Sequence, residues 1–393
     1  MKNRIAALIT SSAMLLLSAC GGAGSSSTGS SENAITSAVS SEEDISSARV
    51  YTEGTKLMVD GKEFWVNGVN TPWQHWNDFG GKMDAEFWDG QFARMAADHI
   101  NCTRIWVNCT GENIVRLKTT GEIKEVNEKH WEDLDKLFAI AEKYKVYVMP
   151  TILSFDHFKE TNGGADKWRT LVQSKEMSDA FAETYVKEFC RRYGDNEYIF
   201  CIDLMNEPDW VHENDECGKI GWEDLCYFFG TCAAAVHESC DTLVTVGTGM
   251  IKYNSDKYDG NYFSDKFLKE ITGRDGAYLD LYSPHYYMWE KSFLGFPFDR
   301  SPTDFGLDGT KPVVTGETPN DDEKESGMTA AEKYRSSYDN GWNGVMVWME
   351  YREGTEEVWH EYALTAEATN AIYDYIPEKV DPLEVHSEMG EAA

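Results

Sequence analysis

Two glutamates stand where apolar, strand-like runs of the sequence end. The run CIDLMNEPDW begins with residues typical of a buried strand and then reaches Asn206, Glu207 and Pro208. Proline cannot donate to a strand ladder, so the strand stops where it delivers the carboxyl group. The run PVVTGE ends in the same way at Glu317. Two carboxyl groups brought together can divide acid–base work, with one protonated and the other ionised.

Polar and aromatic residues also mark the ends of other apolar runs. They are Arg104 in CTRIWVN, His157 after VYVMPTIL, His285 and Tyr287 after LDLYSP, and Trp348 in GVMVWME. If these runs are parallel strands, their carboxyl ends meet on one face of the molecule. The chain then gathers charged, amide and aromatic side chains around the two glutamates.

Strand-like and helical patterns alternate along most of the chain. Expected helices cover residues 84–98, 127–144, 175–192, 222–239, 329–340 and 364–375, and eight strand-like runs lie between and around them. The first run, KLMVDGKEFWVNG, predicts a hairpin with a tight Asp60-Gly61 turn, whose second half continues as a strand to Asn70.

This alternation favours parallel βαβ units, with the sheet buried on both faces. A doubly wound sheet would show a Gly-rich phosphate turn after its first strand, and NGVNTPW is not one. The fold that we predict is therefore α/β, a (β/α)8 TIM barrel with a short N-terminal β-hairpin. In such a barrel the active site lies at the C-terminal ends of the strands.

The two glutamates take different protonation states if Arg104 lies beside one of them. A guanidinium keeps its neighbouring carboxylate charged, and that negative charge raises the pKa of the second carboxyl group. The charged group can attack an anomeric carbon while the protonated group releases the leaving oxygen, which is the chemistry of glycoside hydrolysis. Retention of configuration requires carboxyl groups about 5 to 5.5 Å apart.

The ordered set of motifs resembles the glycoside hydrolases of clan A, and among them family five, which includes cellulases and β-mannanases. It consists of NEP after the fourth expected strand, HYY after the sixth and TGET after the seventh, with Arg104 in the second and Trp348 after the eighth, within about residues 56–375. The resemblance implies that Glu207 is the acid/base and Glu317 the nucleophile.

The same resemblance implies supporting roles for other residues. They are Asn206 at the sugar 2-hydroxyl, Arg104 and Tyr287 beside the nucleophile, His285 at the sugar-binding floor, Trp348 under the −1 sugar, and His157 as a looser match to a histidine after the third strand. Trp73 and Trp106 lie near strand ends, where their indole faces either stack on sugar rings or pack the barrel.

The bulk composition limits the classes of partner and cofactor. A formal net charge of −32 argues against a nucleic-acid partner, whereas a neutral polysaccharide is indifferent to it. The nine cysteines include no C-x-x-C pair and no Cys/His cluster at zinc spacing, so we expect no metal. For the predicted glycoside hydrolase we also expect no organic cofactor. Their spacing does not define a disulfide connectivity.

The first residues are typical of an export signal. A short charged region and an apolar run lead into Leu17-Ser18-Ala19-Cys20, which resembles a bacterial lipobox with Cys20 as the lipidated residue. We expect a lipoprotein signal peptide at 1–19, the lipidated cysteine and a flexible Gly/Ser-rich tether at 20–47, a catalytic domain at 48–382 and an acidic tail at 383–393. The expected localisation is extracytoplasmic, at the bacterial cell surface, with membrane contact through the lipid.

The predicted function is a retaining β-glycoside hydrolase that cleaves a β-1,4-linked plant polysaccharide. Mannan, glucomannan and cellulose-type glucan all fit the shared motifs, and long loops after several strands favour an endo mode. The alternatives are an exo-acting β-glycosidase on oligosaccharides, a transglycosylase that uses the same residues, and a non-catalytic sugar-binding lipoprotein. The intact pair of glutamates argues against the last, because binding alone does not need two opposed carboxyl groups.

Overall fold

The computed structural model describes residues 47–258, 260–348 and 356–384. The predicted signal peptide, Cys20 and nearly all of the predicted tether lie outside the described residues, as do residues 385–393 of the predicted tail. In the described part of the chain, no helix has the length and apolar character needed to cross a bilayer.

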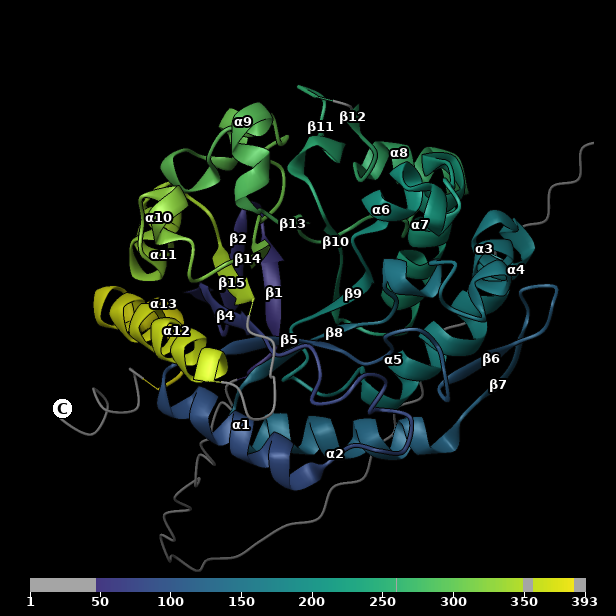
Figure 1. Ribbon diagram of the computed structural model, residues 1–393, viewed down its shortest axis with the longest axis horizontal. Helices are drawn as coiled ribbons and strands as arrows, with labels where there is room; N and C mark the ends of the chain where they lie inside the picture. The colour runs from purple at the N-terminus through teal and green to yellow at the C-terminus, as the bar shows by residue number, and fades with distance from the viewer. Residues whose placement is uncertain (1–46, 259, 349–355, 385–393) are drawn as a thin grey trace, which may run out of the picture. The chain divides into compact units, whose positions relative to one another are not determined.

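Eight parallel strands form the centre of the molecule. They are β4 (Val66–Asn70), β5 (Cys102–Trp106), β8 (Tyr147–Thr151), β9 (Cys201–Asn206), β10 (Leu243–Thr248), β13 (Ser283–Pro284), β14 (Thr315–Thr318) and β15 (Gly344–Trp348). The strands are hydrogen-bonded in the order β13-β10-β9-β8-β5-β4-β15-β14. A parallel bridge between Tyr282 and Val313 joins the two end strands, so the sheet closes into a barrel (Figure 1). The predicted (β/α)8 fold is confirmed.

Helices surround this barrel, and most of them bury an apolar face (Figure 1). They are α1 (Ala85–Ala97), α2 (Glu128–Tyr144), α3 (Ala165–Gln173), α4 (Lys175–Phe181), α5 (Lys187–Tyr193), α6 (Pro208–Glu213), α7 (Trp222–Ser239), α8 (Asp265–Thr272), α9 (Lys291–Leu294), α10 (Glu323–Ser326), α11 (Ala330–Asp339), α12 (Glu356–Tyr375) and α13 (Pro377–Val380). Asp84 caps α1 and Asn127 caps α2, because each side chain accepts backbone N–H groups of the first turn.

An antiparallel sheet of three strands precedes the barrel: β1 (Val50–Glu53), β2 (Lys56–Val59) and β3 (Lys62–Phe64). Asp60 and Gly61 form the predicted two-residue turn, with φ of 47° and 74°. The predicted continuous strand to Asn70 is wrong at Trp65, where the chain leaves the hairpin and its N–H donates to the Lys379 carbonyl. The chain must turn there because β3 pairs antiparallel with β2, whereas β4 pairs parallel with β5 and β15.

Several local elements differ from the sequence patterns. The predicted helix at 175–192 consists of α4 and α5 joined by a π-helical turn, Ala182–Val186. The predicted strand LDLYSPHYY contains only the two-residue β13, since Pro284 lacks the N–H that would continue its ladder. The short strands β6 (Val115–Leu117), β7 (Ile123–Val126), β11 (Asn254–Ser255) and β12 (Gly260–Asn261) lie in connections that had no predicted structure, as do α3 and α6.

The register between β4 and β15 leaves no room for a side chain at Gly344. A Cβ there would lie 2.3 Å from the Val66 Cβ and 2.7 Å from the Val66 carbonyl oxygen. We expect Gly344→Ala to lower the free energy of unfolding by about 2 kcal/mol or more, because overpacking displaces one strand from the other. Urea unfolding of the full chain measures the change.

Gly90→Ala is the matched control, since Gly90 lies in α1 with no atom within 4 Å of its added Cβ. Alanine favours a helix interior, so this variant should gain up to about 1 kcal/mol. A Gly344→Ala variant as stable as the wild type would show that the register of β4 and β15 is wrong.

Candidate active site

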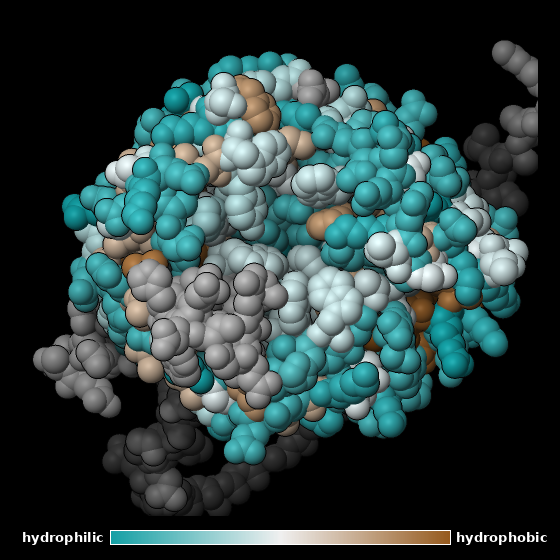
Figure 2. Space-filling view, viewed as in Figure 1, coloured by the Kyte–Doolittle hydropathy of each residue, from teal (hydrophilic) through white to brown (hydrophobic). Residues whose placement is uncertain are grey.

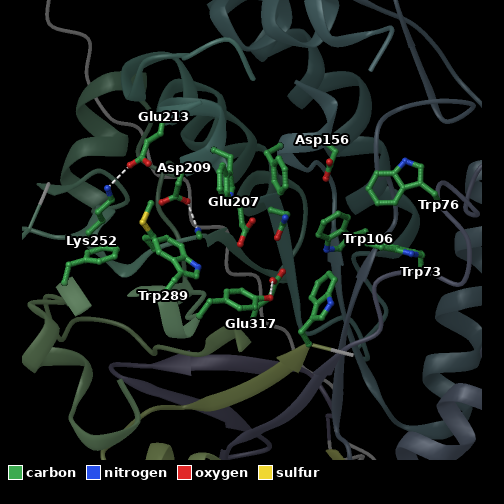
Figure 3. Close-up of a pocket in the computed structure, with 18 residues that line it drawn as sticks. Trp73, Trp76, Trp106, Asp156, Glu207, Asp209, Glu213, Lys252, Trp289 and Glu317 are labelled. Carbon is green, nitrogen blue, oxygen red and sulfur yellow. Dashed lines mark hydrogen bonds and ion pairs between the residues drawn. The ribbon is translucent and has the colours of Figure 1, made fainter. Parts of the chain in front are cut away.

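A cavity of about 690 Å³ opens at the C-terminal ends of the barrel strands. Figure 2 shows this face hollowed near its centre, and Figure 3 shows Glu207 and Glu317 in the middle of the cavity. Its lining is mostly aromatic and acidic: Trp73, Trp76, Trp106, Phe155, Asp156, Asn206, Glu207, Asp209, Trp210, Glu213, Gly249, Met250, Lys252, Tyr287, Trp289, Phe293, Glu317 and Trp348.

Arg104 lies beneath this cavity on β5 and is completely buried. Its Nη1 donates to Glu317 Oε1 at 2.6 Å and to Asn70 Oδ1 at 3.1 Å. Its Nη2 and Nε both donate to Asp203 Oδ2, at 2.7 and 3.0 Å. A buried guanidinium requires this degree of pairing, since leaving a buried charge uncompensated costs several kcal/mol (about 3–5). Arg104 therefore ties strands β4, β5, β9 and β14 together around one positive charge.

Glu317 on β14 is held by donors from two directions. Arg104 donates to Oε1, and the Tyr287 hydroxyl donates to Oε2 at 2.9 Å. Burial raises the pKa of Glu317 overall, although His285, Arg104 and the Tyr287 hydrogen bond each oppose the rise. The two donors fix both carboxylate oxygens and favour the ionised form, which agrees with the predicted partners of this residue.

Glu207 follows β9 in an unusual backbone conformation. Its φ and ψ are 49° and 59°, the left-handed region that non-glycine residues seldom adopt. Its N–H donates to the Gly247 carbonyl at 2.7 Å, and its own carbonyl accepts the N–H of Trp210 at 3.1 Å as α6 begins with Pro208. The strained turn from strand to helix therefore aims the carboxyl group into the cavity.

Burial raises the pKa of Glu207 to about 7. The sequence analysis attributed such a rise to the negative charge of the second glutamate, but desolvation is the larger cause. The positive charge of Arg104 opposes the rise. The Glu207 side chain contacts the His285 Nδ1 at 3.1 Å and receives no guanidinium bond of its own. A group with this pKa is partly protonated near neutral pH and can give up a proton there.

His285 lies between the two glutamates on their buried side. Its Nδ1 is 3.1 Å from Glu207 Oε1 and 3.5 Å from Glu317 Oε2. Burial lowers its pKa to about 4, so the ring is neutral and adds no charge to the pair. Among the described residues, Glu207, His285 and Glu317 are the one group of side chains with a possible metal-binding spacing, and their ligand atoms all lie within 4.8 Å of one another. Both Glu317 oxygens already accept strong hydrogen bonds, so this set fits proton transfer better than metal ligation.

Asn206 presents its amide nitrogen to the cavity. Its Oδ1 accepts a hydrogen bond from Arg104 Nη2 at 2.8 Å, so the oxygen end of the amide faces Arg104. The Nδ2 group can then donate into the cavity, as expected for a residue that binds a sugar hydroxyl. Asn206 lines the cavity directly beside Glu207.

Aromatic rings flank the two glutamates on opposite sides (Figure 3). Trp73 packs edge-to-face against Trp76, Trp106 and Trp348, with ring centroids 4.8, 5.0 and 6.0 Å apart. Trp289 lies across the cavity and packs on Phe293 with centroids 5.7 Å apart. The predicted Trp73, Trp106 and Trp348 all line the cavity.

His157 is the predicted site residue that the structure does not bring to the cavity. Its ring is buried and packs edge-to-face on Trp168 at 4.6 Å, while its Nδ1 bonds the backbone of Ser154 to close a short turn. The neighbouring Asp156 lines the cavity instead. The turn after β8 therefore places the side chain of Asp156, rather than that of His157, at the opening.

Four acidic or amide residues near the site were missed by sequence reasoning. Asn70 and Asp203 are buried partners of Arg104, and both lie within apolar strands whose alternation signalled only a core. Asp209 is buried, lines the cavity and accepts the Gly249 N–H at 2.6 Å. Glu290 is fully buried, and its Oε1 accepts the N–H of Tyr287 at 3.0 Å. Its sequence context, the segment MWEKS, resembles a surface helix.

Comparison with known proteins supports the fold and the resemblance. No family model matches the chain. It is 28% identical over 178 residues to proteins named probable mannan endo-1,4-beta-mannosidase A from Aspergillus flavus and Aspergillus oryzae, a match that covers 40% of this chain and 43% of each relative. The matched segment thus spans less than half the length of these relatives.

Solved structures match over most of the barrel. The endo-1,4-β-mannanase of Eisenia fetida superposes with a TM-score of 0.70 at 19% identity, covering 82% of this chain and 95% of that one. The β-1,4-D-mannanase of Cryptopygus antarcticus gives 0.71 at 16% identity, with 82% and 94% covered. A family 5 mannosidase of Rhizomucor miehei gives 0.51 at 12% identity, with 82% and 98% covered. At the level of fold, these matches confirm the resemblance to family-five glycoside hydrolases that the motifs indicate.

The burial of Glu290 predicts how stability depends on pH. Burial raises its pKa from an ordinary 4.5 to about 9, so between these values the folded chain keeps a proton that the unfolded chain has lost. The free energy of unfolding therefore falls as pH rises through this window. Glu290→Gln keeps an oxygen for the Tyr287 N–H but does not titrate, so at about pH 8 it should be more stable than wild type by at least about 1 kcal/mol.

Urea unfolding at about pH 5 and about pH 8 measures this difference. Near pH 5 the two chains should differ little, because wild-type Glu290 is then protonated in the folded state and partly protonated in the unfolded state. A Gln variant that is less stable than wild type at the higher pH would mean that Glu290 is ionised and paired.

Proposed function

We propose that this chain is a retaining endo-β-1,4-mannanase. The observation that carries the proposal is the pair Glu207 and Glu317, which have carboxyl oxygens within 4.8 Å of each other and unequal surroundings. That separation matches the requirement of a double displacement, about 5 to 5.5 Å between carboxyl groups, rather than the wider gap that admits a water molecule. The relatives named above support mannan as the substrate.

In the first step, Glu317 attacks the anomeric carbon of the sugar while Glu207 gives its proton to the leaving oxygen. The glycosidic bond breaks, a glycosyl ester forms on Glu317, and the reducing-end portion of the chain leaves with the proton. In the second step, Glu207 removes a proton from water, and the resulting nucleophile displaces Glu317 from the same carbon. Both glutamates return to their starting states, and the configuration at the anomeric carbon is retained.

The surrounding residues stabilise the charges that change on Glu317, Glu207 and the sugar during these two steps. Arg104 and Tyr287 donate to Glu317 in the resting state and stabilise the negative charge that returns to its carboxylate as it leaves in the second step. Asn206 Nδ2 is positioned to donate to the 2-hydroxyl, where a contact that strengthens in the transition state contributes several kcal/mol (roughly 2–4). His285 stays neutral and close to Glu207, so it can orient that acid without competing for its proton.

The aromatic lining supports a polymeric substrate and an endo mode. Indole faces suit the apolar faces of sugar rings, and the exposed Trp76 and Trp289 lie on opposite sides of the two glutamates (Figure 3). A chain that passes through the cavity therefore meets an aromatic surface before and after the scissile bond. The protein has a strongly negative net charge and repels acidic polymers, which favours a neutral polysaccharide such as mannan as the substrate.

The product profile of the full chain on β-1,4-mannan, glucomannan and cellulose tests this proposal. Wild type should release manno-oligosaccharides of mixed length from mannan, and from glucomannan it should leave mannose at the new reducing ends. Glu317→Ala should lower kcat by at least about a thousandfold, because it removes the nucleophile. Glu125→Ala is the matched control and should be fully active, since Glu125 lies exposed on β7 and pairs only with the exposed Arg116.

Other outcomes identify the alternatives. Release of single sugars alone would identify an exo-acting enzyme. Products longer than the substrate would identify a transglycosylase. Products from cellulose but not from mannan would identify a glucanase. Binding of mannan without cleavage, equal in wild type and Glu317→Ala, would leave a sugar-binding protein.

We also propose that the enzyme is extracytoplasmic and anchored through a lipid on Cys20. The lipobox-like Leu17-Ser18-Ala19-Cys20 and the Gly/Ser-rich segment after it support this placement. A bacterial host fed a labelled fatty acid should incorporate the label into wild type and not into Cys20→Ser. Equal labelling of both chains, or of neither, would contradict the anchor.

A further inference from the structure

We propose that Cys190 and Cys240 form a disulfide site, closed by exchange with a small-molecule disulfide. Cys190 lies in α5, and Cys240 is the residue that ends α7. The two helices pack against each other on the outside of the barrel. The inference is independent of the proposed function, because it concerns the far side of the barrel from the cavity.

The two cysteines are neighbours. Cys190 lies in the last turn of α5, and Gly194, which ends α5, lets Cys240 approach that turn. A Cβ at Gly194 would lie 2.5 Å from the Cys240 Cβ and 2.5 Å from the Cys190 carbonyl oxygen. Cys240 therefore sits directly against the last turn of α5. Cys240 thus lies beside the turn that contains Cys190, which is the placement that a disulfide needs, because its Cα atoms must lie within about 7 Å.

Exposure distinguishes Cys240 from the other cysteines. All eight cysteines of the described residues are unbridged, and seven of them are buried, whereas Cys240 is partly exposed. A dissolved oxidant can reach Cys240 but not the buried thiols of the barrel. Cys190 is buried and next to it, so it can act only after Cys240 has reacted.

The electrostatic surroundings make Cys240 the attacking group. The hydrogen bond from Cys190 lowers the pKa of Cys240 to about 6, with help from Thr242 and Arg49, although burial opposes it. The same hydrogen bond raises the pKa of Cys190. At neutral pH the pair therefore holds one thiolate and one thiol, the arrangement that thiol–disulfide exchange uses.

The exchange balances in two steps. The Cys240 thiolate attacks one sulfur of the oxidant, forms a mixed disulfide and releases the first thiol. Cys190 loses its proton to solvent and attacks the Cys240 sulfur, which forms the Cys190–Cys240 bond and releases the second thiol. Two protein thiols are oxidised and one small-molecule disulfide is reduced to two thiols.

The site lies where the N-terminal part of the chain joins the barrel. Arg49 Nη2 donates to the Gly194 carbonyl at 2.8 Å, and the N–H of Ala48 donates to Glu197 Oε2 at 2.9 Å. A bond from Cys190 to Cys240 would close the segment that contains β9, Glu207, α6 and α7. The bond lies away from the cavity, and it would thus stabilise the segment that carries Glu207 without contacting the site.

The test treats the full chain with oxidised glutathione, unfolds it in an alkylating agent and maps its peptides by mass. A peptide pair linked through Cys190 and Cys240 is expected, with two fewer alkylated thiols than in the reduced chain. The oxidised chain should melt about 5 °C higher than the reduced chain. Cys190→Ser and Cys240→Ser should each abolish that shift, whereas Cys217→Ser, buried near the opposite end of the barrel, should retain it.

Three results would overturn the inference. They are alkylation of both cysteines after oxidation, glutathione that remains on Cys240, and a link between a different pair of cysteines. The peptide map reports the bond itself, so it remains decisive even if a serine variant folds poorly. Mannan hydrolysis is not part of the readout, so failure of the proposed function would leave this result unchanged.

Discussion

The buried ion pair between Arg104 and the carboxylates of Asp203 and Glu317 is the interaction on which the site depends. Arg104 has no exposed surface, so its charge must be balanced by groups that the barrel itself supplies. Asp203 receives two of its donors and Glu317 a third, while Asn70 and Asn206 accept the remaining contacts. Four strands have to keep their register for these bonds to form together, which links the geometry of the site to the closure of the barrel.

The asymmetry of the two glutamates follows from this arrangement. Glu317 shares the guanidinium and a tyrosine hydroxyl, whereas Glu207 is desolvated at the end of a strained turn and contacts a neutral histidine. Arg104 acts on both groups through its charge, but it donates a hydrogen bond only to Glu317. The barrel therefore gives two identical side chains unequal surroundings, as the proposed division into a nucleophile and an acid requires.

Much of this could be predicted from the sequence. The alternation of apolar runs with helical patterns was enough for the barrel, and the breaks at Pro208 and after Glu317 marked the two carboxyl groups. Arg104 was proposed because its charge fits the electrostatic task, and Tyr287 because the HYY motif matches the family that the sequence resembles. Residues whose role depends on long-range packing could not be predicted in this way. Asp203 and Asn70 lie in strands that look like ordinary core, and the fully buried Glu290 lies in a segment that looks exposed.

His157 shows the opposite error. A histidine after the third strand matched the expected position, but the local turn points its ring into the core and leaves Asp156 at the cavity. Side-chain direction in a loop of a few residues depends on backbone torsions that no periodicity encodes.

The most direct measurement of the central claim is covalent trapping with a 2-deoxy-2-fluoro β-mannobiosyl fluoride, followed by peptide mass analysis. The 2-fluorine slows both steps, but the good fluoride leaving group keeps the first step fast, so the glycosyl ester accumulates. The arrangement of Arg104, Tyr287 and Glu317 predicts an added mannobiosyl mass on the peptide that contains Glu317 and on no other. An adduct on Glu207, or a chain that cleaves mannan but is never labelled, would contradict the assignment of Glu317 as the nucleophile.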